Sequence, residues 1–152
     1  MKKIITLAVT SGLALFLSGC GATNAPAPQA AEVKASDAYN LDVSKVCEIS
    51  ATNSIQDVLG VAKKFNPIAV KNGVEFMRFG MPTSEYITET EKALVAGQKE
   101  ITLLSKGKPT KDVVTVEYAA ERACKFSVMA LQFQNAASTE WKLAVPGDGY
   151  TY

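Results

Sequence analysis

Residues 116–137 read VEYAAERACKFSVMALQFQNAA and form the clearest pattern in the chain. Their apolar side chains recur at spacings of three and four, the period of a helix with one buried face. Glu121 and Lys125 are spaced for an i,i+4 ion pair. We predict a helix that begins within residues 110–115 and ends near Ala137. Its apolar positions are Val116, Ala119, Ala123, Phe126, Ala130, Phe133 and Ala137, and its polar positions are Glu117, Glu121, Arg122, Lys125 and Gln132.

Three short strands are expected around this helix, because apolar and polar residues alternate there over a few positions. The first covers residues 46–52 and places Cys47 on one face. The second covers residues 100–104 and is followed by a turn at residues 105–109. The third begins at Trp141, after the long helix.

Two shorter helices are expected before the second of these strands. Ser54 and Asp57 have the spacing of a capping box, and the apolar pattern after them ends at Asn66-Pro67. The other helix begins at Thr83 or Ser84 and runs to about residue 96, where Gly97 is suited to a helix C-terminus.

Asn72-Gly73 lies between two apolar runs, a pattern typical of a β-hairpin with a type I′ turn. Strands mixed with helices and at least one hairpin favour the α+β class. We therefore expect a mainly antiparallel sheet packed against one long helix and one or two shorter helices.

The first residues of the chain have the pattern of an export signal. Lys2 and Lys3 precede 14 mostly apolar, uncharged residues at positions 4–17, too few to span a bilayer comfortably. Leu17-Ser18-Gly19-Cys20 then resembles the lipobox of bacterial lipoproteins. The resemblance implies cleavage before Cys20 and covalent attachment of lipid, including palmitate-type acyl chains, to that cysteine. Because no ligand-binding signature is found in the sequence, we expect no cofactor besides this covalent lipid.

The resemblance, together with the composition of the rest of the chain, indicates a domain organisation and a location. Residues 1–19 are expected to be a signal peptide, residues 20–38 a lipid-anchored flexible tether rich in Ala and Pro, and residues 39–152 a single globular domain. Gly21 follows the lipidated residue where an Asp would favour retention at the inner membrane. We therefore expect anchoring at the cell outer membrane, with the domain in the periplasm.

Composition narrows the classes of function. Lys2 and Lys3 lie in the export segment, so 14 of the 16 basic residues remain beside 15 acidic ones, a formal charge of −1. Such a balance argues against nucleic-acid binding. The chain has no His, the commonest general base, and no known nucleotide or hydrolase motif. The residue types still allow a small carboxylate-dependent hydrolase, although Glu85, Glu89 and Glu91 are better explained as a solvated face.

The remaining cysteines, Cys47 and Cys124, form an even pair in an exported domain. Two interpretations stay open: a disulfide closing a long loop, or two separately buried thiols. Two cysteines without a histidine make a poor metal site.

Apolar residues crowd both faces of a short segment, and two tyrosines lie in the C-terminal tail. Two interpretations stay open: a sheet covered on both faces followed by a loose end, or an exposed docking surface. These residues are Phe76, Met77, Phe79, Met81, Tyr150 and Tyr152. The leading hypothesis is a non-catalytic lipoprotein that docks onto a larger cell-envelope complex. The alternative is a self-contained binding module for a small apolar ligand, or an enzyme inhibitor.

Overall fold

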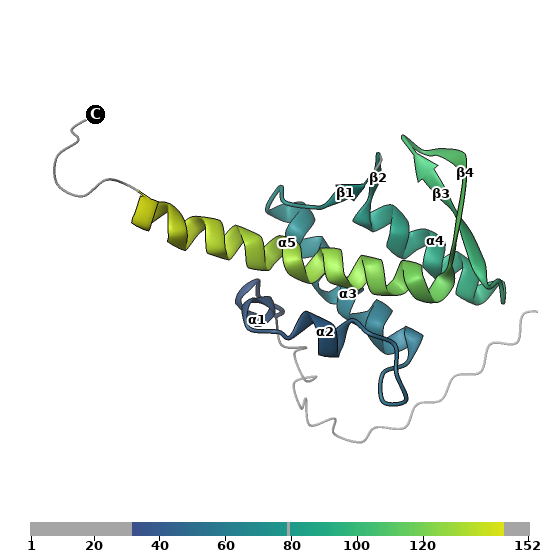
Figure 1. The fold of residues 1–152 in the computed structure, drawn as a ribbon, viewed down its shortest axis with the longest axis horizontal. Coiled ribbons are helices and arrows are strands. Elements are labelled where there is room, and N and C mark those ends of the chain that lie inside the picture. Colours follow the sequence, from purple (N-terminus) through teal and green to yellow (C-terminus); the bar gives the residue numbers. More distant parts are fainter. Residues whose placement is uncertain (1–31, 79, 145–152) are drawn as a thin grey trace, which may run out of the picture. The chain divides into compact units, whose positions relative to one another are not determined.

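The computed structural model describes residues 32–78 and 80–144, with side chains as far as Glu140 (Figure 1). The predicted signal peptide, Cys20, Phe79, Tyr150 and Tyr152 lie outside the described residues. In chain order the elements are α1 (Ser36–Tyr39), α2 (Val43–Val46), α3 (Ile55–Lys71), β1 (Met77–Arg78), β2 (Met81–Pro82), α4 (Thr83–Val95), β3 (Glu100–Ser105), β4 (Lys108–Thr115) and α5 (Val116–Ala144).

The long helix α5 is the centre of the domain, and α3 and α4 make most of the contacts with it (Figure 1). The α+β class is confirmed, because two antiparallel β-hairpins accompany the five helices of the described residues. Each sheet has two strands, β1–β2 and β3–β4. Helices rather than a broad sheet therefore supply most of the core.

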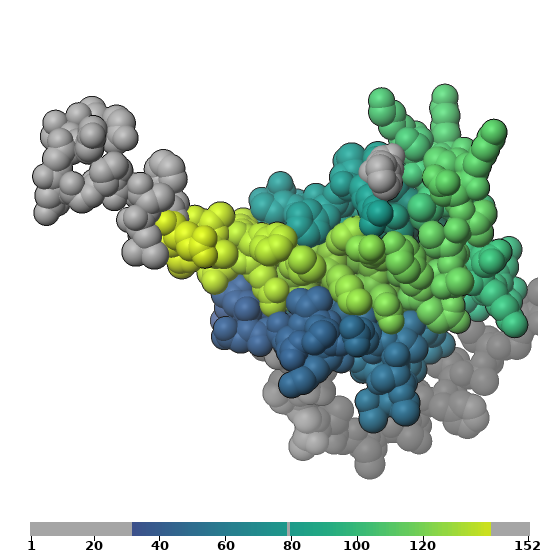
Figure 2. Space-filling model, viewed as in Figure 1, coloured from purple at the N-terminus to yellow at the C-terminus, as the bar shows by residue number. Residues whose placement is uncertain are grey.

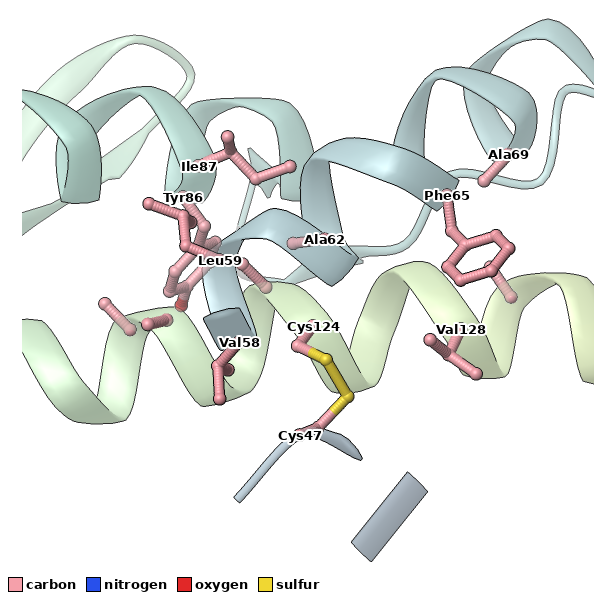
Figure 3. Close-up of a cluster of buried hydrophobic side chains, with 14 of the residues drawn as sticks. Cys47, Val58, Leu59, Ala62, Phe65, Ala69, Tyr86, Ile87, Cys124 and Val128 are labelled. Carbon is pink, nitrogen blue, oxygen red and sulfur yellow. A yellow bond between two sulfur atoms is a disulfide. The ribbon is translucent and has the colours of Figure 1, made fainter. Parts of the chain in front are cut away.

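The core lies where α3 and α4 cover one side of α5 (Figure 3). Val58, Leu59 and Phe65 of α3 lie in one buried cluster with Val128 and the buried alanines of α5. Small residues on α5 let the α3 backbone approach closely, so the alanine-rich stripe serves packing within the domain. The buried α5 alanines are Ala119, Ala120, Ala123 and Ala130.

Cys47 and Cys124 form a disulfide in this core, with Cα atoms 5.4 Å apart (Figure 3). Both side chains are fully buried. Of the two interpretations left open by the sequence, the structure has the disulfide. It ties the segment after α2 to the middle of α5 across 77 residues of chain.

The start of α3 is confirmed. Ser54 Oγ accepts the Asp57 N–H at 3.2 Å and Asp57 Oδ2 accepts the Ser54 N–H at 2.9 Å, so the capping box is complete. The predicted end at Asn66-Pro67 is wrong, because α3 continues through Pro67 to Lys71. Phe65 and Ala69, on either side of the proline, are both buried, and this burial favours continuing the helix.

The predicted Asn72-Gly73 hairpin is also wrong, because these residues terminate α3. Gly73 has φ +70°, its N–H donates to Val70 O at 3.0 Å, and the Val74 N–H donates to Ala69 O at 2.9 Å. This pair of bonds is the Schellman motif, which needs a positive φ at the residue after the C-cap. Gly73 does adopt the positive φ that the sequence pattern indicates, but at the C-terminus of a helix.

The second short helix, α4, is confirmed, including its end at Gly97. Its N-terminus differs from the prediction, since neither Thr83 nor Ser84 caps it with its own side chain. Glu75 does so from a distance: its Oε1 accepts the Ser84 N–H at 2.6 Å and the Asn66 amide at 3.1 Å. A carboxylate suits this place, where the helix dipole favours negative charge.

Strand β3 is confirmed, but its partner β4 was missed. Lys106 (φ +52°) and Gly107 (φ +73°) form the turn between them. Residues 108–115 are therefore a strand, and α5 begins only at Val116. The predicted strand after Trp141 is wrong over residues 141–144, which continue α5.

The N-terminal part of the domain also differs from the prediction. Residues 46–52 form no regular strand; they contain the end of α2 and a turn closed by a single bridge between Ser50 and Asn53. Helix α1 lies where the tether was expected to end, and Ala38 is fully buried. Gln132 of α5 donates to Ala38 O at 3.0 Å and to Leu41 O at 2.9 Å, which fixes this segment to the long helix.

Candidate functional site

The structure separates the predicted docking residues. Met77 is 68 % exposed, whereas Phe76 beside it is half-buried. Met81 is only 1 % exposed and its Sδ accepts the Leu104 N–H at 3.3 Å, so its assignment to a surface is corrected. In the β1–β2 pair Met81 lies opposite Arg78 while Met77 lies opposite Pro82. Alternate strand residues face opposite sides, which explains why one methionine is core and the other is not.

Phe76 belongs to an aromatic strip that runs along α5. Its ring lies 5.6 Å from Phe126 and 6.0 Å from Phe133, in both cases edge to face. Tyr86 of α4 adds a third edge-to-face contact, 6.2 Å from Phe126. Such pairs are favourable arrangements of ring quadrupoles. We call Phe76, Tyr86, Tyr118, Phe126 and Phe133 the aromatic strip.

One end of the aromatic strip is open. Phe133 is 55 % exposed although it follows the buried α5 positions at helical spacing. Helix α3 ends beside it, where the Asn72 amide donates to Gln134 at 2.9 Å, and α5 continues for ten residues beyond Gln134. Ala137 to Glu140 are all exposed, and the last turns of α5 extend past the rest of the described domain (Figure 2). At 1.5 Å per residue this overhang is about 15 Å long.

The other end of the strip carries a cation. The Arg122 Nε donates to Tyr118 Oη at 2.8 Å, and the guanidinium carbon lies 5.0 Å from the Tyr118 ring centroid and 5.7 Å from that of Phe126. These are cation–π distances. The sequence pattern had placed Arg122 on the polar side of α5 and so missed this role. The signal available was the i,i+4 spacing of Tyr118, Arg122 and Phe126.

Arg78 lies in the same neighbourhood. Burial raises the pKa of the Tyr86 hydroxyl, while the positive charges of Arg78 and Arg122 act in the opposite direction. Both guanidinium groups therefore lie close enough to act electrostatically on one tyrosine. This end of the strip combines aromatic surface with positive charge.

Two of the three carboxylates named for a hydrolase, Glu89 and Glu91, are held in ion pairs, whereas Oε2 of the third, Glu85, is buried and has no hydrogen-bond partner among the described residues. Glu89 pairs with Lys92 at 2.7 Å, and Glu91 pairs with Lys63 from α3. Within residues 32–78 and 80–144 no cluster of three or more acidic or cysteine side chains is placed to hold a metal ion. Across the same ranges, no helix combines the length and apolar character needed to cross a bilayer.

A shallow groove of about 800 Å³ lies between the end of α4 and the β3–β4 hairpin. Ile101, Leu104 and Val113 supply apolar surface, and Lys99 and Glu100 supply charge. It is the concave feature that a small-ligand role would use.

Comparison with known proteins gives no further assignment: the chain matches no family model, no curated protein and no solved structure.

Proposed function

We propose that this protein is a non-catalytic lipoprotein, anchored at the cell outer membrane through Cys20, that docks onto a larger cell-envelope assembly. The observation that carries the docking role is the open end of the aromatic strip. Phe133 lies on α5 where that helix extends past its own domain, and both Phe133 and Met77 are large apolar side chains that are more than half exposed. Exposed aromatic and methionine side chains of this kind are enriched in protein interfaces.

The anchor and the location have separate support. The resemblance of residues 17–20 to a lipobox supports a lipid anchor at Cys20. The Cys47–Cys124 disulfide fits an exported domain, because disulfides persist in oxidising compartments such as the periplasm. Labelling with a palmitate analogue tests the anchor: wild type should incorporate label, and Cys20→Ala should not.

Docking is tested by cross-linking native membranes, followed by purification in mild detergent and mass spectrometry. Wild type should recover one large envelope protein in stoichiometric amount. The Met77→Gln/Phe133→Gln variant should lose it, while Val95→Gln should retain it. Val95 is 91 % exposed at the end of α4, so this control removes exposed apolar surface elsewhere. Recovery of the lipoprotein alone in several detergents would refute the docking role.

The groove between α4 and the β3–β4 hairpin supports the second candidate, a self-contained binding module for a small apolar ligand. Backbone amide shifts of Ile101 and Thr102 during titration with short fatty acids test it. Saturable shifts there, together with recovery of the lipoprotein alone from cross-linked membranes, would favour this candidate over docking.

A further inference from the structure

Arg122 is held in one orientation by its neighbours. Its Nε donates to Tyr118 Oη at 2.8 Å, and the Tyr118 and Phe126 rings lie against the guanidinium at 5.0 and 5.7 Å. A guanidinium carries five N–H donors in a rigid fork, and the Nε contact uses one of them. Two aromatic rings therefore lie against the group, while its two terminal nitrogens donate no hydrogen bond to any of the described residues.

None of the carboxylates in the described residues accepts a hydrogen bond from Arg122. Its neighbour Glu121 points to a different contact, accepting the Ile49 N–H at 3.0 Å and pairing with Lys125 at 3.7 Å. Arg122 is only partly exposed, so an incoming carboxylate would be partly screened from water there. At a partly buried position, a charge-assisted bidentate hydrogen bond is stronger than at a fully exposed one.

We infer that Arg122 recognises a carboxylate on the protein partner, whose docking segment is acidic and carries an apolar side chain for Phe133. This inference rests on the proposed docking function and names the chemistry of the partner. The planar guanidinium of an arginine can donate two parallel hydrogen bonds to a carboxylate. Arg78 adds positive charge to the same neighbourhood. A polyanion such as nucleic acid would need a broad basic surface, which a mature chain with a charge of −1 does not supply.

The distance between Arg122 and Phe133 on α5 determines how far apart the acidic and apolar residues of the partner should be. Arg122 and Phe133 are eleven residues apart on one helix, about 16 Å along its axis. A helical partner segment lying along α5 would place its acidic and apolar residues about eleven positions apart. An extended segment, rising about 3.3 Å per residue, would place them about five apart.

The first test uses the chain's own arginines as probes. Arg78 and Arg122 are the only arginines in the sequence, so a ¹⁵N spectrum shows two guanidinium Nε–H signals. The probe is the blocked hexapeptide Phe-Ala-Ala-Ala-Ala-Glu, and its Gln-ending counterpart is the control. The Glu peptide should shift the Arg122 signal with an affinity about tenfold higher than that of the Gln peptide. Equal affinities, or no saturable shift at millimolar peptide, would overturn the inference.

The second test uses the lipidated protein in membranes. Arg122→Gln should lower recovery of the envelope partner at least fivefold, and Arg122→Lys should restore only part of it. Lys125→Gln is the matched control, since Lys125 is a neighbouring α5 cation whose charge is directed to Glu121 and Glu48. Melting temperatures of all three variants check that they fold.

The outcomes separate the inference from the proposed function. Loss of the partner in Met77→Gln/Phe133→Gln with full recovery in Arg122→Gln would leave docking intact and refute the acidic partner. Binding of the Glu peptide only after removal of residues 145–152 would make that segment the occupant of the site, and would also refute it. A fivefold loss in Arg122→Gln with unchanged recovery in Lys125→Gln supports it.

Discussion

Removal of the Cys47–Cys124 disulfide is predicted to remove a large part of the unfolding free energy of this domain. The bridge closes a loop across 77 residues of chain. The chain-entropy treatment assigns such a loop about 4.5 kcal/mol, because the cross-link restricts the unfolded ensemble. Domains of this size have unfolding free energies of only about 5–15 kcal/mol. The Cys47→Ala/Cys124→Ala variant should therefore be folded but marginal.

The measurement is urea unfolding followed by far-ultraviolet circular dichroism, using protein that starts at Gly21 and so omits the predicted lipidation site, Cys20. Wild type treated with a reductant provides the comparison, since it breaks the bridge without changing the sequence. Both should lose about 4 kcal/mol of unfolding free energy with little change in the native spectrum. Hydrogen exchange should show α1 and α2 losing protection first, because the bridge and the Gln132 contacts join this segment to α5.

A loss below about 1 kcal/mol in both samples would refute the reasoning. It would mean that the unfolded chain is already compact enough for the bridge to restrict little. A large loss in the alanine variant alone would instead assign the stability to packing of the buried sulfur atoms.

Three further predictions concern single positions. Leu131→Ala should cost about 2–5 kcal/mol in urea unfolding because Leu131 is fully buried, whereas Phe133→Ala should cost less than about 1 kcal/mol. Gly80→Ala should lower the melting temperature and cost about 1–3 kcal/mol, since Gly80 has φ +83° and a Cβ there would lie 3.3 Å from a backbone nitrogen of the β3–β4 turn. Hydrogen bonds from Ser54 lower the pKa of Asp57, so its contribution is present above the unfolded pKa near 4 and is lost as pH falls through the lower folded value. Asp57→Asn should therefore flatten the dependence of melting temperature on pH between about 2 and 5, and an unchanged profile would contradict this.

Local sequence patterns predict the positions of turns and element ends better than they predict the type of structure at those positions. Asn72-Gly73 predicts a hairpin turn but forms a helix C-terminus, because both structures require the same positive φ at the glycine. The residues on either side did not decide between them. The length of the preceding helix decides between a hairpin turn and a helix C-terminus. Pro67 predicts an end to that helix before Lys71, but the helix continues to Lys71.

Strand β4 was missed for a different reason. Only Thr110 and Val114 among its eight residues are partly buried, so apolar and polar residues do not alternate along it. A two-stranded hairpin that leaves most of one strand in solvent has almost no hydrophobic pattern. Its turn at Lys106-Gly107 was visible, but the strand after it was assigned partly to the helix that follows.

The candidate site was predictable only in part, and the α5 phenylalanines show why. Phe126 and Phe133 are seven residues apart, so the helical period places them on nearly the same face, and the sequence gives no reason to treat them differently. Phe126 is covered by Phe76 and Tyr86, whereas Phe133 is covered on one side only and is 55 % exposed. Exposure at this position depends on where the neighbouring helices stop.

The difference in exposure between Phe126 and Phe133 follows from the lengths of the helices. Helix α5 has 29 residues and α3 has 17, so α5 is about 43 Å long and its main partner about 26 Å. Since the end of α3 lies beside Gln134, the excess length falls at the C-terminal side of α5. Short uncovered helix ends gain little stability from propensity alone, so an overhang of ten residues is poorly supported unless something packs on it. The same argument predicts that partner binding protects the amides of residues 135–144 from hydrogen exchange more strongly than any other part of α5. Protection confined to residues 116–130 would show that the partner binds the covered end instead, and would remove the overhang from the docking surface.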